Sequence, residues 1–306
     1  MINYLQHHQI NKEKWDECID TSVNGIAYVY SWYLDVVCKN WSALILNDYE
    51  AVFPLALNSK FKISYLYQPF FTRYLGVYSK IAITENLVNA FLEAIPSTIQ
   101  FIEFNIHENN HFENADFQKK ERFFQFLDLN KAYQDIFQEY KGDTKRNLKK
   151  AKKNNLKIHE NIAPEKIVDL FRHNKGKQIK ELHSQDYVML QNLMTACNNH
   201  KCGIALGVTN TANELIAAGF FIRSMHQILF LKGSANAEGK ALGAMYLMID
   251  ELVKSYAQKI DSFDFGGSSL ESIASFNHNF GAKNCVYLQV KKNNLPFVVK
   301  LISGKY

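Results

Sequence analysis

The sequence predicts an α/β fold in which helices accompany a sheet of parallel and antiparallel strands (α+β mixed sheet). Two stretches of the sequence support this prediction. Residues 227–282 are typical of a strand, a glycine-containing loop, a long helix, a strand, a Gly-Gly turn and a helix. Residues 156–302 add a strand, two helices and two strands before this stretch, and two strands after it. Short apolar runs bounded by turns indicate strands, and apolar positions three and four apart indicate one face of a helix. A chain of 306 residues is also long enough for two domains.

Residues 1–130 are expected to form the first domain. Its predicted elements, in chain order, are helices at Lys12–Ile19 and Trp32–Lys39, strands at Ala43–Leu46, Ala51–Leu57 and Ile63–Tyr67, a helix at Glu85–Ile95, and strands at Thr98–Ile106 and Arg122–Leu129. The polar stretch His107–Asp116 predicts an exposed loop. Solvated side chains explain its two histidines, His107 and His111, better than a metal site does.

Residues 131–306 are expected to form the second domain. Its predicted helices are Lys131–Tyr140, Glu165–Leu182 and Gln185–Asn199, and its predicted strands are Leu156–His159, Gly203–Val208, Leu215–Ile222, Gln227–Leu231, Ile260–Phe265, Cys285–Val290 and Phe297–Ile302. A further helix has the clearest one-sided apolar pattern in the chain, at Leu242, Met245, Tyr246, Ile249, Leu252, Val253 and Tyr256.

Composition narrows the class of protein. A hydrophobic fraction of 47% with 21% charged residues indicates an ordinary globular protein with a sizeable core. Five cysteines without a CxxC pair do not make a disulfide framework. Cys197, His200 and Cys202 are close in sequence, but no second ligand pair lies nearby, so reduced thiols and no metal are expected. No apolar run has the length of a signal-peptide core or a membrane span, so a soluble cytoplasmic protein is expected.

The formal net charge of +5 is concentrated in one segment, because between Lys141 and Glu160 eight basic residues stand against two acidic ones. We expect a helix here, capped by Asp143 or Thr144. The basic residues that share one side of it are Arg146, Lys149, Lys150 and Lys153. Two interpretations stay open: a solvated helix whose lysines serve solubility, or a helix that contacts phosphates or a nucleic acid such as tRNA.

The loop Asn236–Ala241 precedes the strongest predicted helix. Backbone amides at a helix start have no helical partners, and the helix dipole favours an anion there. Gly239 and Gly243 lie near this start, so a phosphate could approach the backbone. The alternative is that any loop entering a helix needs small residues.

Three motifs occur in a characteristic order. The loop NAEGKA, residues 236–241, is similar to a pyrophosphate-binding loop, with Asn236 in place of the usual Gln or Arg. The helix TKRNLKKAKKNNLKI, residues 144–158, and the segment FDFGGSS…FNHNFGA, residues 263–282, complete the set. Together they resemble the GNAT N-acyltransferase fold and, within it, the FemAB-like branch. The resemblance covers Asp143–Ile302 and implies two GNAT-like units, the N-terminal one degenerate because it carries no recognisable loop.

The resemblance also implies a site. The acyl donor is expected along strand Gln227–Leu231, with its phosphates over the loop. The residues expected to bind the donor are Leu229, Leu231, Ala237, Glu238, Gly239, Lys240 and Ala241. In such a site a strand amide stabilises the oxyanion, and positioning provides much of the rate.

Asp264 and Asn277 are the candidate catalytic residues. Asp264 lies on a predicted central strand and could accept a proton, or could instead anchor the Gly266-Gly267 turn. Asn277 stands where the family often has lysine, and it is a polar residue in the apolar stripe of the last helix. It is therefore expected to face the cleft or a buried hydrogen-bond partner.

Three functional alternatives follow. An acyl-CoA donor such as acetyl-CoA, transferred to an amine acceptor, is suggested by the loop. An aminoacyl-tRNA donor, which peptidoglycan-bridge members of the family use, is suggested by the basic helix. A non-catalytic ligand-binding protein on a GNAT scaffold stays open because the family lysine is replaced by Asn277.

Overall fold

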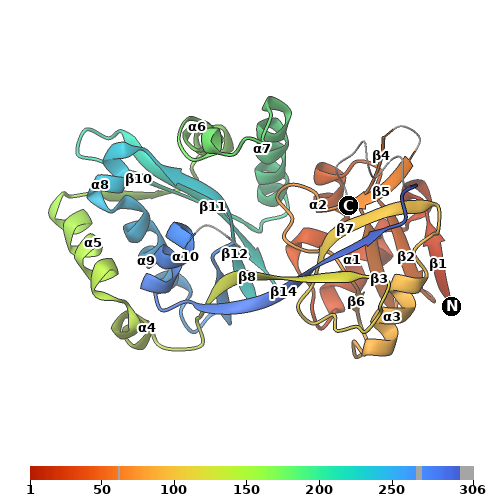
Figure 1. Ribbon diagram of the computed structural model, residues 1–306. Coiled ribbons are helices and arrows are strands. Elements are labelled where there is room, and N and C mark those ends of the chain that lie inside the picture. The colour runs from red at the N-terminus through yellow and green to blue at the C-terminus, as the bar shows by residue number, and fades with distance from the viewer. Residues whose placement is uncertain (61–62, 267–270, 297–306) are drawn as a thin grey trace. The chain divides into compact units, whose positions relative to one another are not determined.

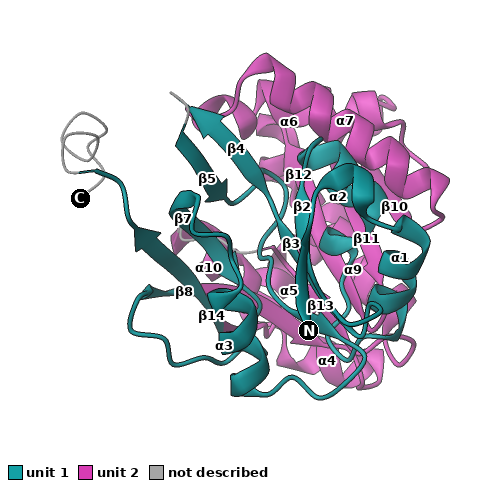
Figure 2. Cartoon of the chain, turned by 90° about the vertical axis from the view of Figure 1, so that its right-hand side faces the viewer, with its two compact units in different colours: residues 1–122, 286–306 teal, residues 123–285 magenta. Residues whose placement is uncertain are grey.

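The computed structural model describes residues 1–60, 63–266 and 271–296. The predicted strand Phe297–Ile302 and part of the predicted Gly-Gly turn lie outside these residues. The chain forms two compact units (Figure 2): residues 1–122 with a segment that begins at Val286, and residues 123–285. It passes from the first unit to the second within strand β8 (Gln118–Asp128) and returns within β14 (Lys283–Asn293).

The first unit combines two groups of strands with three helices. Its elements are β1 (Ile2–Leu5), α1 (Lys12–Thr21), α2 (Ser31–Val37), β2 (Ser42–Leu46), β3 (Ala51–Leu55), β4 (Leu57–Lys60), β5 (Ile63–Tyr67), β6 (Tyr78–Ser79), α3 (Glu85–Glu93) and β7 (Ile99–Ile106). One group has the antiparallel order β1-β2-β3-β6, and the other has the order β4-β5-β7-β14. Within the second group β5 and β7 are parallel.

The predicted elements of this unit are confirmed, with three differences. The predicted strand Ala51–Leu57 divides at Ala56 into β3 and β4, which belong to different groups of strands. Strands β1 and β6 were not predicted, because four and two residues are too few to show a period. His107 is only 4% exposed, so the prediction of a solvated residue is wrong there. Its amide donates to the carbonyl of Leu75, which fixes the start of the loop against the strands.

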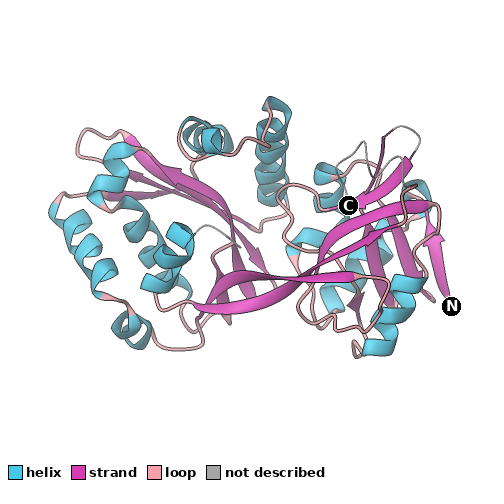
Figure 3. Cartoon of the chain, in the orientation of Figure 1, coloured by secondary structure: helices cyan, strands magenta, loops and turns pink. Residues whose placement is uncertain are grey.

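The second unit contains a sheet of order β8-β13-β12-β11-β10-β9. Its elements after β8 are α4 (Tyr133–Glu139), α5 (Gly142–Lys153), β9 (Lys157–Glu160), α6 (Pro164–His173), α7 (Ser184–Asn199), β10 (Gly203–Thr209), β11 (Leu215–Ser224), β12 (Gln227–Ala235), α8 (Ala237–Leu242), α9 (Ala244–Tyr256), β13 (Ser262–Asp264) and α10 (Glu271–Asn279). Strands β12 and β13 are parallel, and helices α8 and α9 form the crossover that a parallel pair requires. The strand and helix layers are seen in Figure 3.

Helix α9 packs its apolar side on this sheet, which explains the strong helical pattern in the sequence. Its core residues Leu247, Met248, Ile249, Leu252 and Val253 are at most 8% exposed and belong to one cluster with residues of β11, β12 and β13. Helix α6 contacts β11 and β12 and helix α7 contacts β10, and Figure 1 shows both on the other face of the sheet. Burial on two faces explains the apolar runs at residues 215–222 of β11 and 228–231 of β12.

Three predictions about this unit are wrong in detail. The predicted helix Glu165–Leu182 ends at His173, because Gly176 packs where a side chain would meet the hydroxyl of Tyr187 at 2.8 Å. The predicted loop over residues 236–241 is mostly helix α8. Helix α5 begins after Lys141, so Asp143 and Thr144 lie inside it instead of capping it.

Those two side chains make tertiary contacts instead. Thr144 Oγ1 donates to the carbonyl of Asn279 at 2.8 Å, and Tyr246 donates its hydroxyl proton to Asp143 Oδ2 at 2.9 Å. Burial, reinforced by the Asp143 carboxylate, raises the pKa of Tyr246 to about 12. Helices α5, α9 and α10 are therefore joined by polar contacts at one corner of the unit. Within the described ranges of the chain, no helix is long and apolar enough to cross a membrane.

Candidate active site

Strands β12 and β13 separate after a short parallel pairing. The register runs from Gln227 with Ser262 to Leu229 with Asp264. Strand β13 ends there, whereas β12 continues to Ala235. The described pairing therefore covers the first three residues of β12, and we name the region where β12 runs on beyond the end of β13 the slot. In open α/β sheets, ligands bind outside the carboxyl ends of parallel strands.

The predicted donor residues on β12 present backbone to this slot. The side chains of Leu229 and Leu231 are 0% and 6% exposed, so they belong to the core. Gly266 follows β13 with a φ of +75°, and a Cβ on it would lie 2.9 Å from the carbonyl oxygen of Phe230. A glycine is needed there because the turn passes close to the backbone of β12.

The five predicted phosphate-binding residues form the first turns of α8. Asn236 is its N-cap, and its side-chain oxygen accepts from the amide of Gly239 at 2.8 Å. Gly239 itself packs on β11, since a Cβ there would lie 2.2 Å from the carbonyl oxygen of Ile216. The local sequence forms a helix because the cap and this close approach fix the turn. The absence of a side chain at Gly239 thus serves packing.

The remaining residues of this turn face outward. Ala237, Glu238, Lys240 and Ala241 are exposed. The Glu238 carboxylate accepts from Asn210 Nδ2 at 3.0 Å, which ties α8 to the turn after β10. The exposed side of the first turn of α8 therefore carries one partnered carboxylate and the Lys240 ammonium.

The basic helix α5 contacts α8 directly. Lys150 Nζ donates to the carbonyl of Ala241 at 3.2 Å. Gly243, with a φ of +77°, ends α8 where a Cβ would lie 2.8 Å from the carbonyl oxygen of Asn147. Arg146 stays exposed and donates to Asp143 at 2.8 Å. The structure thus brings the predicted polyanion-binding helix beside the predicted phosphate-binding turn, which concentrates positive charge there.

Asp264 is buried at the end of β13. It is 1% exposed, and its Oδ1 accepts from the amide of Gly266 at 2.9 Å. This contact agrees with the predicted anchoring of the turn. Strand alternation places its side chain on the face opposite to Phe263 and Phe265.

Asn277 lies on that other face. It is 2% exposed, and its Nδ2 donates to Gln125 Oε1 at 3.0 Å. The backbone carbonyl of Gln125 accepts from the amide of Phe265, and the side-chain Nε2 of Gln125 donates to Asn284 Oδ1 at 3.0 Å. Of the two expectations for Asn277, the buried hydrogen-bond partner is the one observed. Asp264 and Asn277 are therefore on opposite faces of β13 and do not meet in one catalytic cluster.

The sequence reasoning did not single out Gln125. Its signal was present, because Gln125 is a polar residue within the apolar run Phe123–Leu127 of β8. A polar side chain that is 2% exposed must find a partner, and here it finds two.

The first unit repeats the parallel arrangement but fills the corresponding space with its own chain. Strand β5 pairs in parallel with β7 up to Tyr67 and Glu103, and helix α3 lies between them in sequence. Beyond that point Asn105 holds the intervening segment: its amide donates to Gln68 Oε1 at 2.9 Å, and its Nδ2 donates to the carbonyl of Arg73 at 2.7 Å. In the first unit the segment after β5 is thus held against β7.

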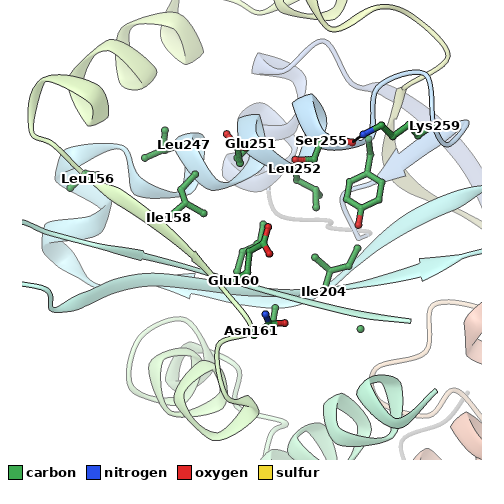
Figure 4. Close-up of a pocket in the computed structure, with 14 residues that line it drawn as sticks. Leu156, Ile158, Glu160, Asn161, Ile204, Leu247, Glu251, Leu252, Ser255 and Lys259 are labelled. Atoms are coloured by element: carbon green, nitrogen blue, oxygen red, sulfur yellow. Dashed lines mark hydrogen bonds between the residues drawn. The ribbon is translucent and has the colours of Figure 1, made fainter. Parts of the chain in front are cut away.

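A cavity lies elsewhere in the second unit, at the C-terminal end of α9. It has a volume of about 840 Å³ between α9 and the strands β9 and β10. Figure 4 shows Glu160 and Ile204 on the strand side and Leu247, Glu251 and Leu252 on the helix side. None of the predicted site residues lines it. A metal site is not formed either, since the described part of the chain holds no group of three potential ligands.

Two repeats of strand, helix and parallel strand, β5-α3-β7 and β12-α8-α9-β13, define the class of fold as a tandem of GNAT-type units. No family model matches the sequence, and no curated protein matches it. The chain is similar to the crystal structure of FemX, with a TM-score of 0.69 and 11% identity over 97% of this chain and 99% of that one.

Two further solved structures show the same fold. One is the C-terminal domain of a putative lysylphosphatidylglycerol synthetase from Agrobacterium fabrum, with a TM-score of 0.59 and 9% identity over 96% of both chains. The other is a tandem GNAT protein from the clavulanic acid biosynthesis pathway, with a TM-score of 0.52 and 12% identity over 95% of this chain and 98% of that one. The predicted fold, a mixed α/β pair of GNAT-type units, is confirmed. Identities this low show the fold alone.

Proposed function

We propose that the protein is an N-acyltransferase whose acyl donor lies in the slot between β12 and β13. The observation that carries the proposal is the end of their pairing at Leu229 and Asp264, while β12 runs on to Ala235 and into α8. In this proposal the backbone of β12 beyond Leu229 binds the acyl carbonyl. The following helix start and Lys240 offer positive charge to donor phosphates.

The proposed reaction needs few protein groups. The amine nitrogen attacks the acyl carbonyl, the carbon–nitrogen bond forms, and the bond to the donor's sulfur or oxygen breaks. A backbone amide in the Leu229–Lys232 stretch stabilises the oxyanion, and the leaving group departs with its phosphates near α8. The amine must lose a proton, and we assign its acceptance to Asp264, the buried carboxylate at the end of β13.

Asn277 has a positioning role in this proposal. Its hydrogen bond to Gln125 links α10 to β8, and β8 is the neighbour of β13. It therefore acts on the slot through the strand that carries Asp264.

The proposed donor is an acyl-CoA, such as acetyl-CoA, and the acceptor is an amine. The test is to incubate the protein with acyl-CoA of several chain lengths and with a panel of primary amines. Released CoA is followed by chromatography, since the protein's own five cysteines would react with a thiol reagent. Amine-dependent release of CoA, with an amide product in the mass spectrum, supports the proposal. Binding of acyl-CoA without consumption would instead indicate a non-catalytic protein on this scaffold.

A charge reversal locates the donor. Lys240→Glu places a carboxylate at the start of α8, so the KM for acyl-CoA should rise by about tenfold. Lys254→Glu makes the same change in charge on an exposed position of α9 and should leave KM unchanged. Equal effects of the two variants would show that the phosphates do not lie at α8.

Aminoacyl-tRNA is the second candidate donor, and the contact between Lys150 and Ala241 favours it. This contact brings α5, a helix with several lysines, next to α8 and the slot. Binding of tRNA would then weaken with salt, with a slope of about 0.7–0.9 for each phosphate contact. Replacing Lys149, Lys150 and Lys153 by alanine should flatten this slope, whereas the same change at the exposed Lys166, Lys177 and Lys180 should not. Absence of tRNA binding at moderate salt would remove this candidate.

A further inference from the structure

Helix α7 ends in a turn that brings two cysteines together. The amide of Cys202 donates to the carbonyl of Cys197 at 3.0 Å, and the amide of Lys201 donates to that of Asn198 at 3.0 Å. Lys201 has a φ of +54°. These features define a Schellman motif, in which the side chains three residues before and two after the cap meet. Cysteines occupy both of these positions.

The two thiols are not equivalent. The Cys197 thiol is fully buried, whereas Cys202 is half-buried, and its thiol donates to the carbonyl oxygen of Cys197 at 3.3 Å. A hydrogen bond from the Cys197 thiol lowers the pKa of Cys202, and the nearby charge of Arg223 acts in the same direction. The same hydrogen bond, with burial, raises the pKa of Cys197. Cys202 is therefore the nucleophile of the pair, because the thiolate is the reactive form.

We propose that Cys197 and Cys202 are a redox-active dithiol that closes to an intrachain disulfide on reaction with hydrogen peroxide. The Cys202 thiolate attacks one peroxide oxygen, the oxygen–oxygen bond breaks, and a sulfenic acid forms. The other oxygen leaves as hydroxide and takes up the proton that the Cys202 thiol released, which makes it water. The Cys197 sulfur then attacks Cys202 and expels its hydroxyl group, which takes the Cys197 proton to become water. Two thiols and one peroxide give one disulfide and two waters.

The place of the pair in the fold adds weight to this assignment. Cys202 directly precedes Gly203, which lines both the 840 Å³ cavity and a second cavity of about 360 Å³. The two cavities thus reach the residue that follows Cys202 in the chain. By contrast Cys18 and Cys38 are buried, and burial raises the pKa of each thiol. They serve as internal controls.

The test uses the full chain, reduced and then treated with one equivalent of hydrogen peroxide. Trypsin cuts after Lys201, which stands between the two cysteines, so a disulfide joins peptides 181–201 and 202–223. We expect this linked pair without reductant, a loss of two hydrogen atoms in its mass, and its separation on reduction. Cys18 and Cys38 should remain open to alkylation after denaturation.

Two variants define the order of events. In Cys197→Ser the Cys202 sulfenic acid should persist and be trapped by dimedone, whereas in Cys202→Ser the same dose should leave Cys197 unmodified. The wild-type peptide map stands by itself if either variant fails to fold. A wild-type protein that accumulates trapped sulfenic acid without linked peptides would overturn the proposal, as would oxidation of Cys18 or Cys38 at the same rate.

Discussion

Asn277 and Gln125 form a side-chain hydrogen bond of 3.0 Å in the core of the second unit, on the face of β13 opposite to Asp264. In the sequence Asn277 stands where the resemblance leads one to expect a lysine. A lysine ammonium in this buried position would lose the water around its charge, which costs free energy. The uncharged amide of Asn277 therefore suits this site better. The replacement thus marks a structural link between α10 and β8.

The first prediction concerns this link. Asn277→Ala removes the donor and leaves Gln125 Oε1 buried with one partner fewer, so the free energy of unfolding should fall by about 1–3 kcal/mol. Urea denaturation measures it. Ser275→Ala, on an exposed position of the same helix, should change the value little. If Asn277→Ala were as stable as wild type, the amide contact would carry no net stabilisation.

The second prediction concerns Gly239. A Cβ there would overlap the backbone carbonyl of Ile216 at 2.2 Å, which no rotamer can relieve, so Gly239→Ala should cost about 1–3 kcal/mol. Gly142→Ala is the matched control, because the nearest atom that a Cβ there would meet is an Arg146 side-chain nitrogen at 4.0 Å. It should be neutral or stabilise by about 0.4–1 kcal/mol. Thermal unfolding of the two variants compares them directly, and equal melting temperatures would contradict the close packing of α8 on β11.

The same two elements show what the sequence can and cannot predict. Helix α9 was predictable because one side of it is buried along all thirteen residues. Its apolar residues therefore recur every three or four positions in the sequence. Helix α8 has six residues, too few for a period, and is fixed by contacts with Ile216 and Asn210 that are distant in sequence. The sequence therefore did not predict the helical conformation of this turn.

The candidate catalytic residues illustrate the same limit. The predicted strand at Ile260–Phe265 implies by alternation that Asp264 and Phe263 face opposite ways. Two contacts decide which face of β13 is covered by α10: the rings of Phe280 and Phe265, whose centroids are 5.9 Å apart, and the hydrogen bond from Asn277 to Gln125. Neither contact is visible in a local sequence pattern. The separation of Asp264 from Asn277 therefore required the tertiary structure.

The third prediction concerns pH and the first unit. Burial, assisted by the charge of Arg73, lowers the pKa of His107 to about 3 from an ordinary value of 6.5. The Glu108 carboxylate at 3.7 Å acts the other way, and the rings of Tyr74 and Tyr78 pack on the imidazole. Because the unfolded chain binds the proton more tightly, stability should fall as the pH drops from about 6.5 toward about 3.

Two variants test this pH dependence by urea denaturation at several pH values. His107→Gln removes the titrating group, so the unfolding midpoint should fall less steeply with acid than in wild type. His111→Gln, at an exposed position of the same loop, should keep the wild-type slope. If His107→Gln also kept that slope, another group would have to account for the acid sensitivity.

The last prediction separates the two roles of Asp264, and it rests on the proposed acyltransferase function. Its Oδ1 accepts from the Gly266 amide, and an asparagine can keep that hydrogen bond through its own side-chain oxygen but cannot accept the proton of an amine. Asp264→Asn should therefore retain the melting temperature and lose about 10²–10⁴-fold in kcat/KM. Asp264→Ala removes both functions and should lower stability as well as activity. An active Asp264→Asn together with an inactive Asp264→Ala would make Asp264 an anchor of the turn, and the amine would then lose its proton to water.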